Sequence, residues 1–298
     1  MKYAKPSISL EQQVELLQKR GLNINNPEKA RHYLSNISFY RLRAYTYPFQ
    51  DNNDPGHPFK GDVSFEEIIQ LYVFDRQLRL LVFDGLEKIE IALRTKIIYE
   101  FARVYGSHWH DRNELYTNQV RFTKDISKLY EEVDRSSETF IKHYKAKYSN
   151  PEYPPSWMAL EVASMGLLSK LFENLNKTEP KKKVVAEFGL KNHLILESWI
   201  HAFAHLRNVC AHHGRLWNRR FTTMPKLPDD TLCPFLKNKD IHKNKLYTLV
   251  SCMLYMLQII SPGHHLASRL KTLFEGCTQV DLHEMGFPKG WEYEPLWN

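Results

Sequence analysis

SFEEIIQLYVFDRQLRLLVFDGLEKIEIALRTKIIYEFARV, residues 64–104, is the stretch that decides the fold, because it predicts one long helix. Ser64 and Glu67 have the spacing of a capping box, in which the two side chains satisfy the first free backbone N–H groups of a helix. Apolar residues then recur at helical spacing, at Leu71, Phe74, Leu78, Val82, Ile89, Leu93 and Ile97. Gly85, near the middle, is expected to bend this helix.

Helix signals continue along the rest of the chain. Ser9 is placed to cap a helix that Gly21 ends, and the pair Asn26-Pro27 opens a second one. Apolar spacing predicts further helices over residues 156–175, 194–211, 244–260 and 266–274. No stretch shows strand alternation flanked by hairpin turns. The sequence therefore predicts an all-α fold, with a bundle formed by the four longest helices.

We expect three segments within this fold. Residues 1–60 form helical segments packed on the bundle, and residues 61–262 form the bundle itself. Residues 263–298 form a C-terminal appendage, which Trp291 and Trp297 are expected to anchor to the bundle.

Composition describes an ordinary globular protein. The chain has 298 residues, of which 43% are hydrophobic and 25% charged, enough to bury a sizeable core. The N-terminus lacks an apolar signal region, and the longest nearly apolar run, residues 249–260, is too short to cross a bilayer. The four cysteines are widely spaced, without a C-x-x-C pair, and are interpreted as reduced thiols. We therefore expect a cytoplasmic protein without membrane contact.

The positive charge is concentrated in one part of the chain. Residues 176–226 contain ten Lys or Arg and three Glu, so 10 − 3 = +7, while the remaining 31 basic and 31 acidic residues cancel. A local cationic field attracts polyanions, of which RNA or DNA fits best; acidic proteins and lipid surfaces are the alternatives.

The stretch LRNVCAHHGRLWNRR, residues 206–220, ends the helix predicted over residues 194–211. One face of that helix is apolar and should pack on the bundle, through Leu196, Trp199, Phe203, Leu206 and Cys210. A separate polar stripe follows steps of 4, 3 and 4, at His201, His205, Asn208 and His212. Gly214 suits the residue that ends the helix.

The pattern R-N-x-x-x-H at Arg207, Asn208 and His212 resembles the motif of the HEPN-superfamily ribonucleases. The wider pattern is similar to the abortive-infection Abi-like proteins of the AbiD/AbiF group. Five segments carry this resemblance in the same order: SFYRLRAYTYPF (38–49), FDRQLRLLVFDGLEKIEIALRT (74–95), PPSWMALEVASMGLLSKLF (154–172), RNVCAHHGRLWNR (207–219) and MGFPKGWEYEPLW (285–297).

The resemblance implies a HEPN-like helical bundle that acts as an RNA-cleaving toxin in phage defence. It further implies that a small structured RNA inhibits some members as an antitoxin. HEPN sites are usually composite, so the resemblance also implies a homodimer whose motif helices face each other.

The motif residues suit RNA cleavage without a cofactor or metal. His212 can act as base or acid because its charge changes near neutral pH, and Arg207 can stabilise a phosphorane. Asn208 could orient either group. His213 is the alternative catalytic histidine, and Arg207 could instead pair with a carboxylate such as Glu90. Zinc on His201, His205 and His212 is disfavoured because no carboxylate or thiolate completes the stripe.

Residues around the motif are candidates for RNA contact. The group Arg215, Trp217, Arg219 and Arg220 could bind phosphates and stack a base, or could only cover the end of the bundle. The run Lys181, Lys182 and Lys183 could add to the field or form a solvated surface.

Asp75 with Arg79, and Glu90 with Arg94, are pairs spaced i, i+4, which usually lie on a solvated helix face. Because both pairs lie in the segment 74–95 that carries the resemblance, the resemblance implies that they face the Arg207 helix and hold its side chains. The rival interpretation of the whole chain is a protein that binds RNA or senses a phage component without cleavage.

Overall fold

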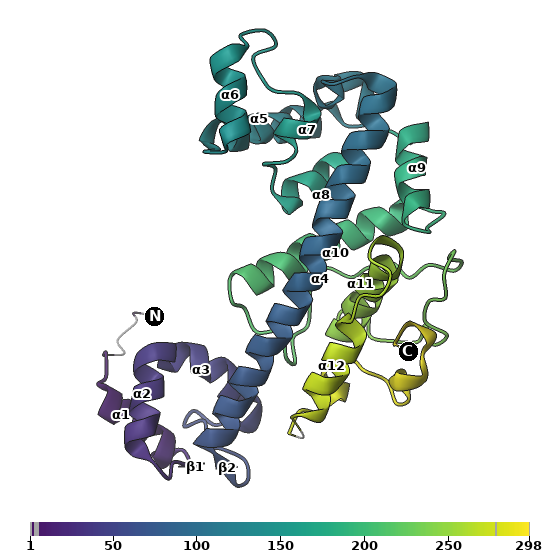
Figure 1. Cartoon of the computed structure of the whole chain (residues 1–298). Helices are drawn as coiled ribbons and strands as arrows, with labels where there is room; N and C mark the ends of the chain where they lie inside the picture. The colour runs from purple at the N-terminus through teal and green to yellow at the C-terminus, as the bar shows by residue number, and fades with distance from the viewer. Residues whose placement is uncertain (1, 3–5, 278, 298) are drawn as a thin grey trace. The chain divides into compact units, whose positions relative to one another are not determined.

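The computed structural model describes residues 2, 6–277 and 279–297 (Figure 1). In this part of the chain the only strands are β1 (Leu22–Asn23) and β2 (Val63–Ser64), which pair in parallel with Leu22 opposite Val63. The predicted all-α fold is confirmed. None of the helices in these residues is long and apolar enough to span a membrane.

The α-helices are α1 (Leu10–Lys19), α2 (Pro27–Ile37), α3 (Phe39–Thr46), α4 (Phe65–Tyr105), α5 (Gln119–Arg135), α6 (Thr139–Lys147), α7 (Ser156–Ala159), α8 (Met165–Asn174), α9 (Glu179–Glu187), α10 (His193–Ala211), α11 (Leu246–Ile260) and α12 (Leu266–Glu275). Short 3-10 helices are η1 (Tyr47–Phe49), η2 (Trp109–Asp111), η3 (Asn113–Leu115), η4 (Leu282–Met285), η5 (Trp291–Tyr293) and η6 (Pro295–Trp297).

The chain forms two compact units. Unit 1 comprises residues 1–79 and 271–281, and unit 2 comprises residues 80–270 and 282–298. The predicted segment boundaries, at residues 60 and 262, lie inside these units.

Three helix starts in unit 1, those of α1, α2 and α4, are as the sequence predicts, whereas α3 was not predicted. The Ser9 hydroxyl accepts the backbone N–H of Gln12, and the Gln12 side chain accepts the N–H of Ser9. The Asn26 side chain caps α2 by accepting from the N–H of Lys29. At the start of α4, the Glu67 carboxylate accepts from the backbone N–H and hydroxyl of Ser64, at 2.7 and 2.8 Å. These caps satisfy N–H groups that would otherwise lack partners.

Asp75 and Arg79 form a buried pair inside unit 1. The Asp75 carboxylate accepts a 2.6 Å hydrogen bond from the Tyr45 hydroxyl of α3 and pairs with the Arg79 guanidinium. Burial and the Asp75 charge raise the pKa of Tyr45 far above its usual range. The two side chains thus fasten α3 to α4, and the expectation that this pair faces the Arg207 helix stays a prediction.

Unit 2 contains the longer part of α4 together with α8, α10 and α11, which are drawn around it in Figure 1. Gly85 allows a close approach, because a Cβ atom there would lie 3.0 Å from the Met253 side chain of α11 and 3.0 Å from Leu266. α4 continues through this position as one helix. The structure thus gives Gly85 a packing role, and the expected bend stays a prediction.

The helix predicted over residues 156–175 is divided into α7 and α8, which corrects that prediction. Ser164 caps α8, and the segment between the helices presents the carbonyl oxygens of Leu160 and Glu161 to Arg94. A continuous helix would use those carbonyls for its own hydrogen bonds, so the Arg94 contact accompanies the break.

The end of the C-terminal segment packs on α11 through Trp297. The Trp297 ring stacks on Tyr247 with centroids 5.8 Å apart, and its indole N–H donates to the Ser251 hydroxyl at 3.3 Å. Trp291 meets Trp297 edge to face, so the two tryptophans form one aromatic cluster. Their predicted anchoring role is confirmed.

Candidate functional site

The Arg207 motif lies on the last turn of α10. The predicted apolar face of this helix is buried in unit 2, through Leu196, Trp199, Phe203, Leu206 and Cys210. The predicted polar stripe lies outward: His201, Asn208 and His212 are exposed, and His205 is half-buried. The 3.6-residue period therefore separates core from candidate site as the sequence predicts.

The two histidines of the motif have different backbone roles. His212 is the C-cap of α10, and its N–H donates to the Asn208 carbonyl at 3.0 Å. His213 has a left-handed conformation with φ +57°, the position that glycine usually takes after a helix. Its N–H donates to the Cys210 carbonyl, and that of Gly214 donates to the Val209 carbonyl, at 3.0 and 2.7 Å.

These bonds form a Schellman ending of the helix. The sequence predicts that Gly214 ends the helix; in the structure His213 takes the left-handed position of this ending and Gly214 follows it. Gly214 is needed for space, because a Cβ atom would lie 3.0 Å from a Val209 methyl group and 3.1 Å from its carbonyl oxygen. A histidine in the left-handed region costs about 1 kcal/mol, and such strain is concentrated at functional sites.

Arg207 is held on one side and exposed on the other. Its Nε lies 3.5 Å from a carboxylate oxygen of Glu90, and its guanidinium lies 5.9 Å from the centre of the Phe83 ring. The Arg207 side chain retains 36% exposure. Both contacts come from α4, so α4 fixes the direction of a cation that still reaches solvent.

Glu90 is shared between two arginines. Its other carboxylate oxygen accepts a 2.8 Å bond from Arg94, whose guanidinium also donates to the carbonyls of Leu160, at 2.8 Å, and Glu161. The side chains of Glu90 and Arg94 are 14% and 9% exposed. The predicted contact of Glu90 with the Arg207 helix is present, and Arg94 contributes by binding Glu90. The alternative interpretation, in which Arg207 pairs with Glu90, is observed as well, because the Glu90 carboxylate contacts both Arg94 and Arg207.

Lys181 is not available to RNA, which corrects its predicted role. Its side chain is 2% exposed, and its ammonium lies 2.6 Å from the Glu197 carboxylate and 2.7 Å from the Leu175 carbonyl. Burial lowers the pKa of Lys181, against the opposing effect of Glu197. Lys182 and Lys183 are exposed, in agreement with either interpretation of the lysine run.

The basic loop after the motif is partly buried. Trp217 is only 5% exposed, so its predicted stacking on a base is corrected to packing inside unit 2. Arg215 lies over the Trp217 ring, and Arg219 lies over Phe221 while donating to the Arg215 carbonyl. Arg220 is exposed, whereas Arg215 and Arg219 are half-buried.

Phe221 joins part of this loop to the polar stripe. The His205 ring meets the Phe221 ring edge to face with centroids 6.3 Å apart, and the Arg219 guanidinium lies 5.9 Å from the centre of the same Phe221 ring. Burial lowers the pKa of His205, and the neighbouring charges of Arg219 and His201 lower it further.

Lys245 is a buried cation that no sequence pattern selected. It is 8% exposed, and its ammonium donates to the Glu284 carbonyl at 2.6 Å and to the Asn218 side chain at 3.4 Å. Burial lowers its pKa, and the charges of Arg220 and Arg215 act in the same direction. Lys245 thus joins the basic loop to the C-terminal segment. This role of Lys245 depends on tertiary packing, and no local motif in the sequence predicts it.

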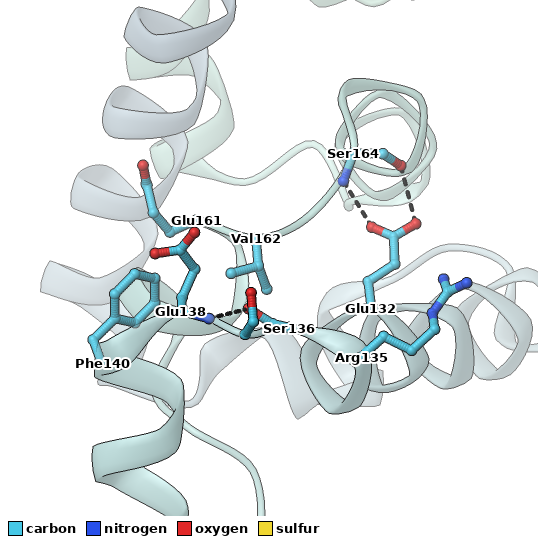
Figure 2. A pocket seen from close by; sticks show the side chains of 9 residues that line it. Glu132, Arg135, Ser136, Glu138, Phe140, Glu161, Val162 and Ser164 are labelled. Atoms are coloured by element: carbon cyan, nitrogen blue, oxygen red, sulfur yellow. Dashed lines mark hydrogen bonds between the residues drawn. The ribbon is translucent and has the colours of Figure 1, made fainter.

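A separate hollow of about 780 Å³ lies elsewhere in unit 2 (Figure 2). It is lined by Glu132, Arg135, Ser136, Ser137, Glu138, Phe140, Glu161, Val162 and Ser164. Its three carboxylates outnumber its single arginine, so it repels phosphate. Figure 2 shows the Glu132 carboxylate accepting from the backbone N–H and hydroxyl of Ser164, which fixes the start of α8. The hollow contains none of the residues that the sequence analysis selected.

Within the described residues, no three His, Cys, Asp or Glu side chains gather as the ligands of a metal ion would. The polar stripe of His201, His205 and His212 forms no such group.

The fold and the site together describe an all-α protein that exposes an arginine and a histidine at the end of one helix, α10. Comparison with known families gives its identity: the chain belongs to the family described as Abi-like protein, which matches residues 32–218. The matched range covers more than half of the chain and includes the whole Arg207–His212 motif. The family indicates a role in abortive infection, a form of phage defence. No curated protein and no solved structure matches the chain.

Proposed function

We propose that this protein is a HEPN-type endoribonuclease toxin of an abortive-infection system, with Arg207 and His212 at its reaction centre. The observation that carries the proposal is the setting of Arg207. Glu90 and Phe83 hold the guanidinium from one side, while its other side reaches solvent on the helix end that also exposes His212. A structural ion pair alone would not require a histidine at the end of the same helix, five residues further along the chain.

The proposed chemistry needs no metal ion. The His212 imidazole takes the proton of a ribose 2′-hydroxyl, whose oxygen attacks the adjacent phosphorus. The Arg207 fork stabilises the negative charge that develops on the phosphorane oxygens. The bond from phosphorus to the 5′-oxygen breaks, and a protonated imidazole supplies the proton to that oxygen. The products are a 2′,3′-cyclic phosphate and a 5′-hydroxyl.

The need for both a base and an acid supports a homodimer, in which each protomer contributes one motif. α4, which supplies Glu90, also exposes large apolar side chains at Leu80 and Ile91, at 55% and 56%. These residues are eleven positions apart, about three helical turns, and so share one face of α4. Covering that face with a second copy would bury apolar area close to the motif.

The cationic residues outside the reaction centre would bind the RNA backbone. Arg220, Lys182 and Lys183 are exposed, and Arg219 lies over the Phe221 ring, which contacts His205. The same surface would hold a small structured RNA as an inhibitor, since a folded RNA presents many phosphates at once.

The test is cleavage of a single-stranded RNA by purified protein, freed of bound nucleic acid, in the presence of EDTA. We expect cleavage with 2′,3′-cyclic phosphate ends. Activity that is lost in EDTA and restored by a divalent ion would contradict the metal-independent mechanism. Tight RNA binding without any cleavage would favour the rival function, an RNA-binding protein.

A further inference from the structure

Unit 1 contains two neighbouring arginines, Arg20 and Arg43. Arg20 follows α1, Arg43 lies on α3, and both line one small cleft together with Phe39. In the described residues neither arginine has a carboxylate oxygen within 4 Å. Arg31 of the same unit differs, because its guanidinium lies 3.2 Å from the Glu11 carboxylate.

The surroundings of Arg20 are unfavourable as they stand. Its buried Nε finds no hydrogen-bond partner among the residues that the structure describes. Burial lowers the pKa of Arg20, and the charge of Arg43 lowers it further. A buried donor without a partner is destabilising, and so are two adjacent like charges. A bound anion would relieve both conditions at once.

The size of the cleft limits where an anion can lie. Its enclosed space is about 10 Å³, which is room for a single water molecule. A phosphate group would therefore lie at the mouth of the cleft, against the guanidinium edges. The planar guanidinium fork matches the spacing of two phosphate oxygens.

Exposed aromatic rings accompany this pair. Tyr40 is 84% exposed and Tyr47 is 49% exposed. Tyr40, Arg43 and Tyr47 follow steps of three and four along α3 and η1, so they lie on one helical face. A phosphate-binding cation beside exposed aromatic rings is the arrangement that binds single-stranded nucleic acid, because every base can stack on a ring.

We propose that the Arg20–Arg43 cleft binds a backbone phosphate of single-stranded RNA, with Tyr40 stacking on a neighbouring base. The choice of RNA over DNA rests on the proposed function. The proposal adds an RNA-binding site in unit 1, apart from the motif of unit 2. A polyphosphate without bases would use the arginines and leave Tyr40 without a role.

The experiment measures affinity for a fluorescein-labelled 12-nucleotide oligo(U) RNA, with all variants in full-length His212→Ala protein. Arg20→Gln and Arg43→Gln should each weaken binding roughly five- to tenfold, and should make the log–log salt dependence shallower by about 0.7. Tyr40→Ala should weaken RNA binding by a similar factor, while leaving competition by polyphosphate unchanged. Arg43→Lys should lie between wild type and Arg43→Gln, because it keeps the charge and loses the fork.

Arg31→Gln is the matched control, because Arg31 is an ion-paired arginine of the same unit, and it should change affinity less than twofold. Urea unfolding verifies that each variant is folded. Unchanged affinity and salt dependence in both Arg20→Gln and Arg43→Gln would overturn the proposal. Equal binding of RNA by Tyr40→Ala would overturn the stacking role and leave a site for phosphate alone. Because cleavage is not measured, these results are independent of whether the proposed nuclease activity holds.

Discussion

Lys181→Met tests whether a cationic residue selected from the sequence is part of the core. The ammonium of Lys181 is 2.6 Å from Glu197 and donates to two backbone carbonyls, and the Lys181 and Glu197 side chains are 2% and 11% exposed. Methionine preserves most of the volume and removes the charge, so Glu197 is left buried without its partner. Breaking a buried pair in this way typically costs about 3–5 kcal/mol.

The expected loss is large enough to measure in two ways. For a unit of this size, about 3–5 kcal/mol corresponds to a fall in Tm of roughly 6–20 °C. Urea unfolding followed by circular dichroism should give the same loss of free energy. The double variant Lys181→Met with Glu197→Leu should recover most of it, because no unpaired charge remains.

Lys182→Met is the matched control for this prediction. Lys182 is the next residue, and its pair with Glu179 is exposed at 57% and 67%, so its loss should cost less than about 1 kcal/mol. A Lys181→Met protein as stable as Lys182→Met, or an RNA affinity that falls in Lys181→Met alone, would refute the assignment of Lys181 to the core.

Three further outcomes follow from the structure. Burial lowers the pKa of His110 to about 4, so the unfolded chain binds more protons between pH 6.5 and 4. The contribution of this group to the free energy of unfolding should therefore be fully present above pH 6.5 and fall on acidification, by up to roughly 3 kcal/mol. His110→Gln should flatten the dependence of the unfolding free energy on pH, as measured by urea unfolding. An unchanged pH dependence would contradict this prediction. Glu90→Gln should slow RNA cleavage about tenfold and change RNA affinity less than twofold, because Arg207 loses its orientation. Glu187→Gln is the control: it removes an ion pair with Lys96 and should leave the cleavage rate unchanged. Ile91→Glu should convert a dimer to a monomer in light scattering, while Val120→Glu, on an apolar side chain that is 83% exposed on α5, should not; equal behaviour of the two would argue against the α4 interface.

Local periodicity was sufficient for much of the fold. The capping residues Ser9, Asn26 and Ser64 mark helix starts because their side chains act within four residues of themselves. The division of α10 into an apolar face and a polar stripe is equally local. The contact of Glu90 with the Arg207 helix was also predicted, although its basis was the family resemblance and no local rule.

The features of the fold and the site that could not be predicted depend on contacts between residues far apart in the chain. Lys181 looks like one member of a solvated run, yet the fold places Glu197 beside it. The helix predicted from Ser156 breaks where Arg94, more than sixty residues earlier, binds two backbone carbonyls. Arg20 follows α1 and Arg43 lies on α3, so their shared cleft has no signature in either segment.

The measurement that tests the central claim most directly is the single-turnover rate of RNA cleavage by His212→Ala, with His213→Ala as its neighbour control and RNA affinity measured in parallel. Removal of a proton-transfer group predicts a rate lower by roughly two to four orders of magnitude in His212→Ala, with little change in affinity. His213→Ala should cleave at close to the wild-type rate, and growth arrest on expression should follow the same order. If both variants cleave RNA and arrest growth as the wild type does, catalysis by this motif is wrong.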